Sequence, residues 1–375
     1  MGHEWRATMA SLTDSLTRAE KPPVPLALPD GSRLLILPFG GRLLGLFPAG
    51  SDENFLWTNP ALATADSAAA WLARDGWPNP GGDRTWLAPE IELFIGDLDR
   101  PGQTYAVPPA LDPGNWTLTS AEASGVSLTN EARLRLHRSG VEVGVRLGKS
   151  YGPAGNLLSG TPLASAGLQY AGYTQVTTLE VEPQPDADVR LGIWNLLQLP
   201  PPGVMLIPTR DRVESQQVFG ALSPGELTAE PHLVRWEMGG DGVDAKIALR
   251  APLLTGRAGY VRRSAQDDTL DLVVREFAVE PEGDYVDALW EAPHETGWAF
   301  QACCVRTGAE RFNELEYHAP AVTSTPGANA GRDESRLWAF RGPSAAISAA
   351  VELLLAADPA GAHGTDDLLS QVRAQ

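Results

Sequence analysis

Two glutamates and a histidine alternate within one short segment of the chain. Residues 312–320 have the sequence Phe-Asn-Glu-Leu-Glu-Tyr-His-Ala-Pro, which contains Glu314, Glu316 and His318. In a strand these three side chains share a face, with the two glutamates about 6–7 Å apart along it. Neighbouring carboxylates repel, so one of them holds its proton more tightly, and a histidine beside a carboxylate has a raised pKa. The segment therefore predicts a site for proton transfer.

Two further segments, residues 81–90 and 193–198, combine polar side chains with tryptophan. Flat aromatic faces stack on the C–H face of a pyranose, while amides and the planar guanidinium hydrogen-bond sugar hydroxyls. Most of the 11 tryptophans should be core residues, but Trp86 and Trp194 have polar neighbours. The predicted substrate-binding residues are Arg84, Trp86, Glu90, Trp194, Asn195 and Gln198. Together they predict a small-molecule carbohydrate as the ligand.

Metal and cofactor chemistry find little support in the sequence. A Glu/Glu/His set can bind a divalent cation, but one strand seldom supplies a whole metal site. The two cysteines, Cys303 and Cys304, are adjacent and form no CxxC motif. The sequence contains no Walker A loop, GxSxG or HExxH motif. We therefore expect neither a metal nor a cofactor.

The acidic composition disfavours some classes of partner. The formal net charge of the 375 residues is -18 and the sequence pI is about 4.7. Such a surface repels nucleic acid and anionic lipid. No run of 18 apolar residues occurs, and residues 1–21 lack the apolar core of a signal peptide. With no disulfide framework either, we expect a soluble cytoplasmic protein that binds neither nucleic acid nor membranes.

Alternation of apolar and polar residues dominates the chain. Residues 133–138 and 141–147 alternate on either side of Ser139-Gly140, which indicates a β-hairpin. The 38 glycines and 31 prolines interrupt such stretches repeatedly, as in a large antiparallel protein. Further strands are predicted at residues 34–37, 42–47, 177–182, 244–250 and 270–279.

Helical patterns are few. An alanine-rich stretch spans residues 65–74, and residues 344–357 place apolar side chains on one helical face. No repeat, linker or composition shift marks a boundary. We predict an all-β protein, a single large antiparallel β-sandwich at residues 22–357 with a few peripheral helices. Residues 1–21 and 358–375 are predicted to be terminal extensions.

Several short motifs, in the order in which they occur, resemble one known family. Residues 41–46 and 56–60 are similar to the opening strands of aldose 1-epimerases, the galactose mutarotases. Residues 81–90 resemble the Gly-Gly segment that borders the sugar in bacterial relatives of these enzymes. Residues 315–320 resemble the segment that carries the catalytic glutamate. The resemblance implies the galactose mutarotase-like supersandwich fold, with Glu316 as the base and Glu314 as its neighbour.

One departure from the family pattern concerns the catalytic acid. Mutarotases have a histidine in the segment that matches residues 191–196, and here that position is Leu191. A substitute proton donor would have to come from His318, Glu314, Glu90 or a residue that the motifs do not identify.

Three functions remain open from the sequence. The favoured one is an isomerase of the aldose 1-epimerase type, in which Glu316 takes the anomeric hydroxyl proton of a sugar or sugar derivative. The second is a glycoside hydrolase or lyase on the same scaffold, which needs carboxyls on both sides of the scissile bond; Glu90 would face Glu316. The third is a protein that binds or senses carbohydrate without catalysis.

Overall fold

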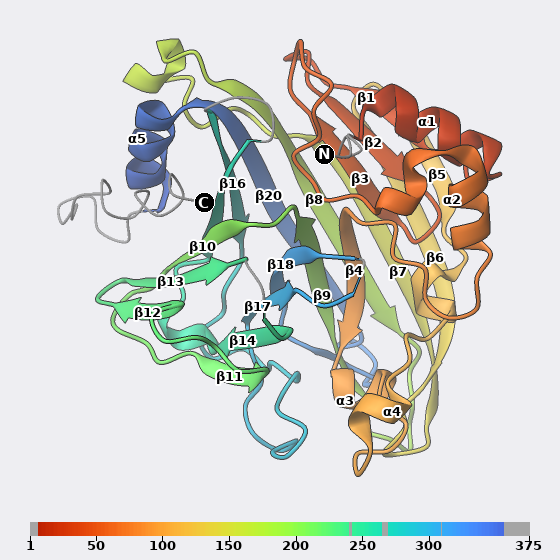
Figure 1. Ribbon diagram of the computed structural model, residues 1–375. Helices are drawn as coiled ribbons and strands as arrows, with labels where there is room; N and C mark the ends of the chain where they lie inside the picture. Colours follow the sequence, from red (N-terminus) through yellow and green to blue (C-terminus); the bar gives the residue numbers. More distant parts are fainter. Residues whose placement is uncertain (1–6, 240–241, 265–268, 309, 356–375) are drawn as a thin grey trace.

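Two antiparallel sheets pack face to face in the computed structural model, which describes residues 7–239, 242–264, 269–308 and 310–355 (Figure 1). In the first sheet the strands follow the order β1 (Val24–Ala27), β2 (Arg33–Leu37), β3 (Arg42–Phe47), β4 (Asp83–Ala88), β9 (Arg190–Leu199), β18 (Phe312–His318), β17 (Phe300–Val305), β14 (Ala245–Leu249) and β11 (Gln216–Phe219), and β19 (Val322–Thr323) pairs with β9.

The second sheet has the order β12 (Leu227–Glu230), β13 (Leu233–Met238), β10 (Gly203–Pro208), β15 (Arg257–Arg263), β16 (Thr269–Phe277), β20 (Ala330–Pro343), β8 (Gln169–Val181), β7 (Glu142–Pro153), β6 (Gly125–Arg135) and β5 (Thr117–Glu122). The predicted antiparallel β-sandwich is therefore confirmed. The predicted hairpin corresponds to β6 and β7, and the other five predicted strands lie in β2, β3, β8, β14 and β16.

The helices lie around the sandwich (Figure 1). They are α1 (Met9–Arg18), α2 (Ala65–Leu72), α3 (Glu90–Leu93), α4 (Pro101–Thr104) and α5 (Ser344–Leu355), with short helical turns at η1 (Pro60–Ala63), η2 (Ala110–Gly114), η3 (Pro162–Ser165) and η4 (Ala251–Leu253). Of these, α1, α2 and α5 pack on outer faces of the sheets, and α3 and α4 lie at one end. The apolar face of α5 packs on the second sheet. None of the described helices is long and apolar enough to cross a membrane.

The segment before residue 22 is joined to the core rather than set apart from it. Leu12 and Leu16 of α1 are fully buried against β2 and β3, in a cluster that includes Leu35 and Leu44. Thr8 and Ser11 form a capping box that fixes the start of this helix. The predicted boundary at residue 22 was therefore placed too late. The predicted extension at residues 358–375 lies outside the described residues.

Successive side chains of β18 point to opposite faces of the first sheet, so the residues on the two faces have different roles. Asn313, Leu315 and Tyr317 point toward the second sheet, where Tyr317 donates a hydrogen bond to Asp333 of β20. The residues between them, including Glu314 and Glu316, point to the outer face. β18 is in the middle of its sheet, and all seven of its residues are buried.

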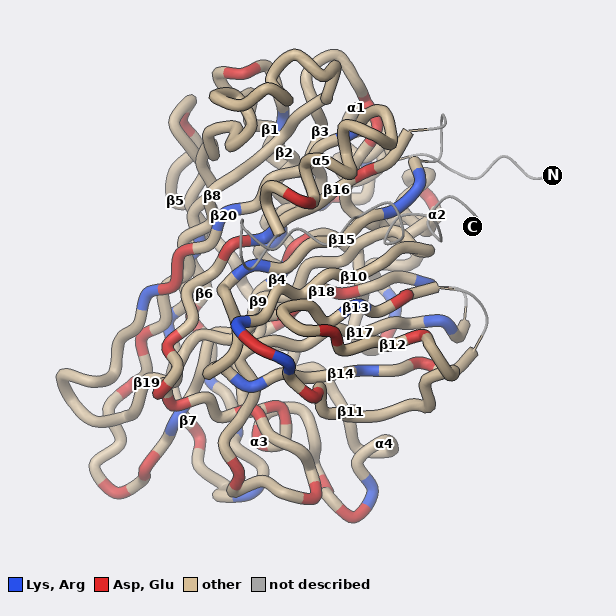
Figure 2. The backbone as a smooth tube through the Cα atoms, turned by 90° about the vertical axis from the view of Figure 1, so that its left-hand side faces the viewer, with Lys and Arg blue, Asp and Glu red and all other residues tan. Residues whose placement is uncertain are grey.

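Charged residues of both signs are interspersed over the molecule (Figure 2). The tube shows Lys and Arg alternating with Asp and Glu along strands and loops instead of forming a face of one sign. In this view charge does not single out a binding face, and the buried charges on the outer face of the first sheet are the more informative feature.

Candidate active site

Five neighbouring strands bring the candidate site together. Antiparallel register places Glu314 of β18 beside Gln198 of β9 on one side and Cys303 of β17 on the other. Cys303 in turn lies opposite Lys246 of β14. On the far side of β9, the β4 strand contributes Arg84 and Trp86. These side chains share the outer face because paired residues in a sheet project the same way.

Glu316 is the most enclosed carboxyl of this face, with an exposed fraction of 0%. Its Oε2 lies 3.1 Å from Nζ of Lys246 and accepts a 2.9 Å hydrogen bond from Nε1 of Trp194. Its Oε1 has no hydrogen-bond partner among the described residues. One oxygen of this buried carboxyl is thus held and oriented, while the other is left to accept a proton or a ligand.

Burial determines the proton affinity of Glu316. Loss of water raises its pKa to about 7; the Lys246 ammonium opposes this rise and the Glu314 carboxylate adds to it. For Lys246, burial alone would lower the pKa, but Glu316 and Glu90 raise it above its usual value. The result is a carboxyl that can exchange its proton near neutral pH beside a lysine that stays cationic.

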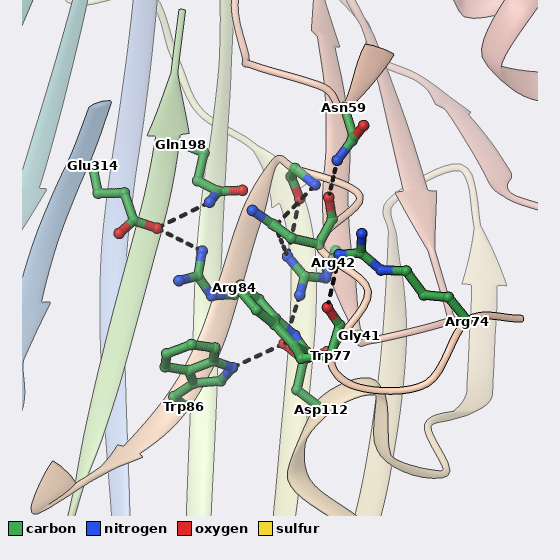
Figure 3. A network of polar contacts seen from close by, with 12 residues as sticks. Gly41, Arg42, Asn59, Arg74, Trp77, Arg84, Trp86, Asp112, Gln198 and Glu314 are labelled. Atoms are coloured by element: carbon green, nitrogen blue, oxygen red, sulfur yellow. Dashed lines mark hydrogen bonds and ion pairs between the residues drawn. The ribbon is translucent and has the colours of Figure 1, made fainter. Parts of the chain in front are cut away.

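Glu314 is held by two residues that the sequence singled out. Its Oε1 lies 2.7 Å from Nη1 of Arg84 and accepts a 3.0 Å hydrogen bond from Nε2 of Gln198 (Figure 3). The Arg84 guanidinium also lies 4.2 Å from the ring centroid of Trp86 and 5.1 Å from that of Trp77. The pairing and the aromatic contacts fix Arg84 in one position.

A buried aspartate, Asp112, organises the aromatic part of the site. Its Oδ2 accepts hydrogen bonds of 2.9 Å from the indole Nε1 atoms of both Trp77 and Trp86 (Figure 3). The same oxygen lies 2.5 Å from Nη2 of Arg42, which is fully buried. Asp112 therefore aims both indole rings at Arg84. Its position in an irregular helical turn gave no sequence signal.

Trp86 and Trp194, predicted as stacking platforms, do not present open faces. Trp194 is 1% exposed, stacks with His318 at 5.3 Å between ring centroids, and has Lys246 4.6 Å from its centroid. Trp86 contacts Arg84 and the ring of Phe94. Both indoles contact the charged side chains of the site in this closed arrangement, and the expectation that they stack on a sugar stays a prediction.

His318 shares the face of the glutamates, but its pKa is lowered where the sequence analysis expected it to be raised. Its Nε2 lies 3.0 Å from Oε1 of Gln301, and Oδ2 of Asp287 is 3.9 Å away. Burial, together with the nearby Lys246 ammonium, lowers the pKa of His318 well below its usual value. The expected rise beside a carboxylate was wrong because desolvation outweighs that attraction. The imidazole is neutral at pH 7.

Glu90 joins the same group from the start of α3, shortly after the end of β4. It is half-buried, its backbone N–H donates a 2.7 Å hydrogen bond to Oδ1 of Asp287, and Tyr105 and Trp290 hydrogen-bond to its carboxyl. Burial raises the pKa values of Glu90 and Asp287, while Lys246 opposes both shifts. Glu90 thus contacts the charged cluster, as the sequence predicted for a residue at the site.

Asn195 is the predicted site residue that the structure does not bring to this face. It follows Trp194 on β9, so its side chain projects between the two sheets and is fully buried. There it donates hydrogen bonds to Tyr317 and Asp333 and accepts one from Thr85. Asn195 is a structural residue of the sandwich interior.

Lys246 and Asp287 are, with Asp112, charged residues of the site that the sequence interpretation missed. Lys246 lies among apolar residues in Ala-Lys-Ile-Ala-Leu, and a lysine in an otherwise buried strand was an available signal. Asp287 lies in an irregular loop between β16 and β17 and had none. Its position depends on loop packing, which residue spacing does not encode.

Two pockets are lined by residues that lie close in sequence to the site. One of about 410 Å³ is lined by Trp77 and Phe312, and Phe312 is two residues before Glu314 on the same face of β18. Another, of about 790 Å³, is lined by Pro89 and Val286, the neighbours in sequence of Glu90 and Asp287. Neither pocket is lined by a charged residue of the cluster itself.

A metal ion is one alternative occupant of the cluster. Sγ of Cys303 and carboxyl oxygens of Glu314 and Glu316 all lie within 4.8 Å of one another. Thiolate and carboxylate ligands of this kind suit zinc. However, Arg84 and Lys246 already pair with the two carboxyls. A cation would have to displace them.

Comparison with known proteins yields structural similarities only. No protein-family model matches the chain, and no curated protein matches it. A galactose mutarotase-like protein from Lactobacillus casei is similar in structure, with 11% identity and a TM-score of 0.46 over 85% of this chain and 100% of that chain.

Two further similar structures have related descriptions. A GalM/aldose epimerase homologue from C. elegans has 12% identity and a TM-score of 0.40 over 86% of this chain and 99% of that chain. Galactose 1-epimerase from Lactobacillus acidophilus has 9% identity and a TM-score of 0.39 over 84% and 92%. At these values the similarity carries no argument about activity, which must come from the side chains.

Proposed function

We propose that this chain is a carbohydrate isomerase that interconverts the anomers of a sugar, with Glu316 as its base. The observation that carries the proposal is the buried Glu316 carboxyl, which has one oxygen held by Lys246 and Trp194 and the other without a partner. General bases work best when their pKa lies near the working pH, and burial raises the pKa of Glu316 to about 7.

The missing catalytic histidine of the mutarotase pattern has a substitute in Lys246. Glu316 accepts the proton of the anomeric hydroxyl, C1 becomes a carbonyl, and the C1–O5 bond breaks with its electron pair going to O5. Lys246 donates a proton to O5 as this oxygen becomes basic. Rotation about C1–C2 and the reverse steps close the other anomer. The reverse steps return one proton to Lys246 and take the other from Glu316, so each turnover ends with the cation and the carboxylate that lie 3.1 Å apart at its start.

His318 does not fit the role of proton donor. A donor must carry a proton that it can release, and the lowered pKa of His318 keeps the imidazole neutral. Its stacking on Trp194 suggests that it supports the indole that orients Glu316. Arg84 and Gln198, held at Glu314, are the donors best placed to bind sugar hydroxyls.

Entry of a sugar requires the cover of the site to open. Phe94 packs on Trp86 and Trp194 with ring centroids 4.9 and 6.0 Å away, and Trp77 lies over Arg84. These covering residues come from loops and short helical turns, the parts of a fold that open at least cost. In the proposed reaction they exclude water once the sugar is bound.

The test is anomer interconversion measured by NMR exchange across common aldoses. We expect catalysis above the background rate for at least one sugar, and a loss of 100-fold or more in Glu316→Gln, which keeps the shape but not the base. Glu276→Gln is the matched control, because Glu276 is also a strand carboxylate paired with a cation, in its case Arg257. Sugar binding without any interconversion would favour a non-catalytic binding protein instead.

A further inference from the structure

The buried charges of the site do not balance. The site has two cations, Lys246 and Arg84. The carboxyls that interact with one or both of them are Glu90, Asp287, Glu314 and Glu316. His318 is neutral, and burial raises the pKa of Cys303, so neither contributes charge at pH 7. With every carboxyl ionised, the four negative charges in the described part of the site exceed the two positive charges by two.

Burial favours the neutral, protonated form of several of these carboxyls when the site is empty. Burial raises the pKa values of Glu90, Asp287 and Glu316, and the Glu314 carboxylate contributes to the shift of Glu316. A ligand with a positive group would replace such a proton, because a buried carboxylate gains most from a paired cation. A ligand with a negative group would add to an existing excess and would be repelled.

The geometry offers such a positive group both a partner and a way in. Oε1 of Glu316 is buried without a hydrogen-bond partner, although Oε2 of the same carboxyl is fully engaged. The pocket of about 410 Å³ has the aromatic rings of Trp77 and Phe312 in its walls, and Phe312 is two residues before Glu314 on the same face of β18. Aromatic faces also attract ammonium groups.

We propose that the substrate class of this site is the amino sugars, bound with their ammonium group beside the Glu314 and Glu316 carboxylates. This inference rests on the proposed function. An amine on C2 is the neighbour of the anomeric carbon, so a sugar whose C1 hydroxyl reaches Glu316 also brings the ammonium into the acidic cluster. Sugar phosphates are the class that the same charge count excludes.

The test compares glucosamine with glucose by calorimetry, since the two differ only in the amine at C2. We expect glucosamine to bind at least 10-fold more tightly than glucose at pH 7, and glucose 6-phosphate to bind more weakly than either. N-acetylglucosamine, whose nitrogen is neutral, should lose the advantage of the amine. Equal affinity for glucosamine and glucose, or tighter binding of the phosphate, would overturn the inference.

A pair of variants locates the effect within the site. Glu314→Gln should reduce the preference for glucosamine over glucose to below about 3-fold. Glu310→Gln is the control: Glu310 pairs with Arg74 at the rim of the same pocket, so the preference should be unchanged. If Glu314→Gln fails to fold, the comparison of the four sugars on the unmodified protein still decides the question.

The outcomes separate this inference from the proposed function. If neutral hexoses bind and are interconverted with no advantage for the amine, only the amino-sugar inference fails. If none of the sugars binds or reacts, both fail. Elemental analysis of the purified protein completes the test, because a divalent metal retained at Cys303, Glu314 and Glu316 would supply the missing charge and contradict the inference.

Discussion

At the scale of single residues, paired charges hold the candidate site together. Arg42, which is fully buried, depends on Asp112, and the same carboxylate oxygen orients Trp77 and Trp86. A buried ion pair contributes little net stability when intact, but breaking it leaves an uncompensated charge away from water. The consequences of single substitutions should therefore differ sharply between such pairs and pairs on the surface.

Asp112→Asn should destabilise the protein by about 3–5 kcal/mol, because the neutral amide leaves Arg42 buried without its counter-charge. Urea unfolding followed by far-UV circular dichroism measures the change. Asp52→Asn is the control: Asp52 pairs with Arg33 on the surface, so its removal should change the free energy of unfolding by no more than about 0.5 kcal/mol. Similar effects of the two substitutions would contradict the role given to Asp112.

At the scale of elements, two nearby polar residues of β9 project to opposite faces of the sheet and have different roles. Gln198 projects to the outer face and donates to Glu314, whereas Asn195 projects between the sheets and contacts Tyr317 and Asp333. The period of two in a strand is the whole reason for this difference. A binding role for one of them therefore implies a structural role for the other.

Asn195→Ala should cost about 2–4 kcal/mol of stability by leaving buried partners unsatisfied, with little change in sugar affinity of the folded protein. Gln198→Ala should weaken sugar binding several-fold at a smaller cost in stability. Thermal unfolding and calorimetric titration of both variants measure the two effects. Weaker sugar binding in Asn195→Ala alone would show that the faces have been assigned the wrong way round.

The sequence predicted those features that depend on local periodicity. The alternation at residues 312–318 placed Glu314, Glu316 and His318 on one face, and the hairpin at β6 and β7 followed from its turn. Asn195 was assigned to the site because it is polar. Its place directly after Trp194 on the strand, which puts the two side chains on opposite faces, was given too little weight. Lys246 and Asp287 reach the site only through strand order and loop packing, which are long-range properties of the fold. The low pKa of His318 likewise depends on tertiary burial.

At the scale of the whole molecule, the sandwich interior contains a buried lysine that lowers the stability of the fold. Lys149 of β7 is 2% exposed and its Nζ has no hydrogen-bond partner among the described residues. Burial lowers its pKa to about 7, although Asp83 opposes the shift. Because the pKa of an unfolded lysine is about 10.4, protonation favours the unfolded state over the window between these values.

Lys149→Met should therefore stabilise the protein by about 3–5 kcal/mol at pH 7. The stability of the unmodified protein should rise from pH 7 to pH 10, as the unfolded state alone keeps the proton, and the variant should lack this part of the slope. Urea unfolding at several pH values measures both. Lys246→Met is the contrasting control, since it removes the partner of Glu316 and should destabilise. A destabilised Lys149→Met would contradict the assigned burial cost.

The most direct test of the central claim, that Glu316 is a base poised by burial beside Lys246, is the pH dependence of kcat/KM for anomer interconversion. A base acts when deprotonated, so the rate should rise with pH through a midpoint near 7 and level off above it. In Lys246→Met, where the opposing cation is gone, the midpoint of the residual rate should move to higher pH. A rate that is flat from pH 5 to pH 9, or one that persists unchanged in Glu316→Gln, would contradict the claim.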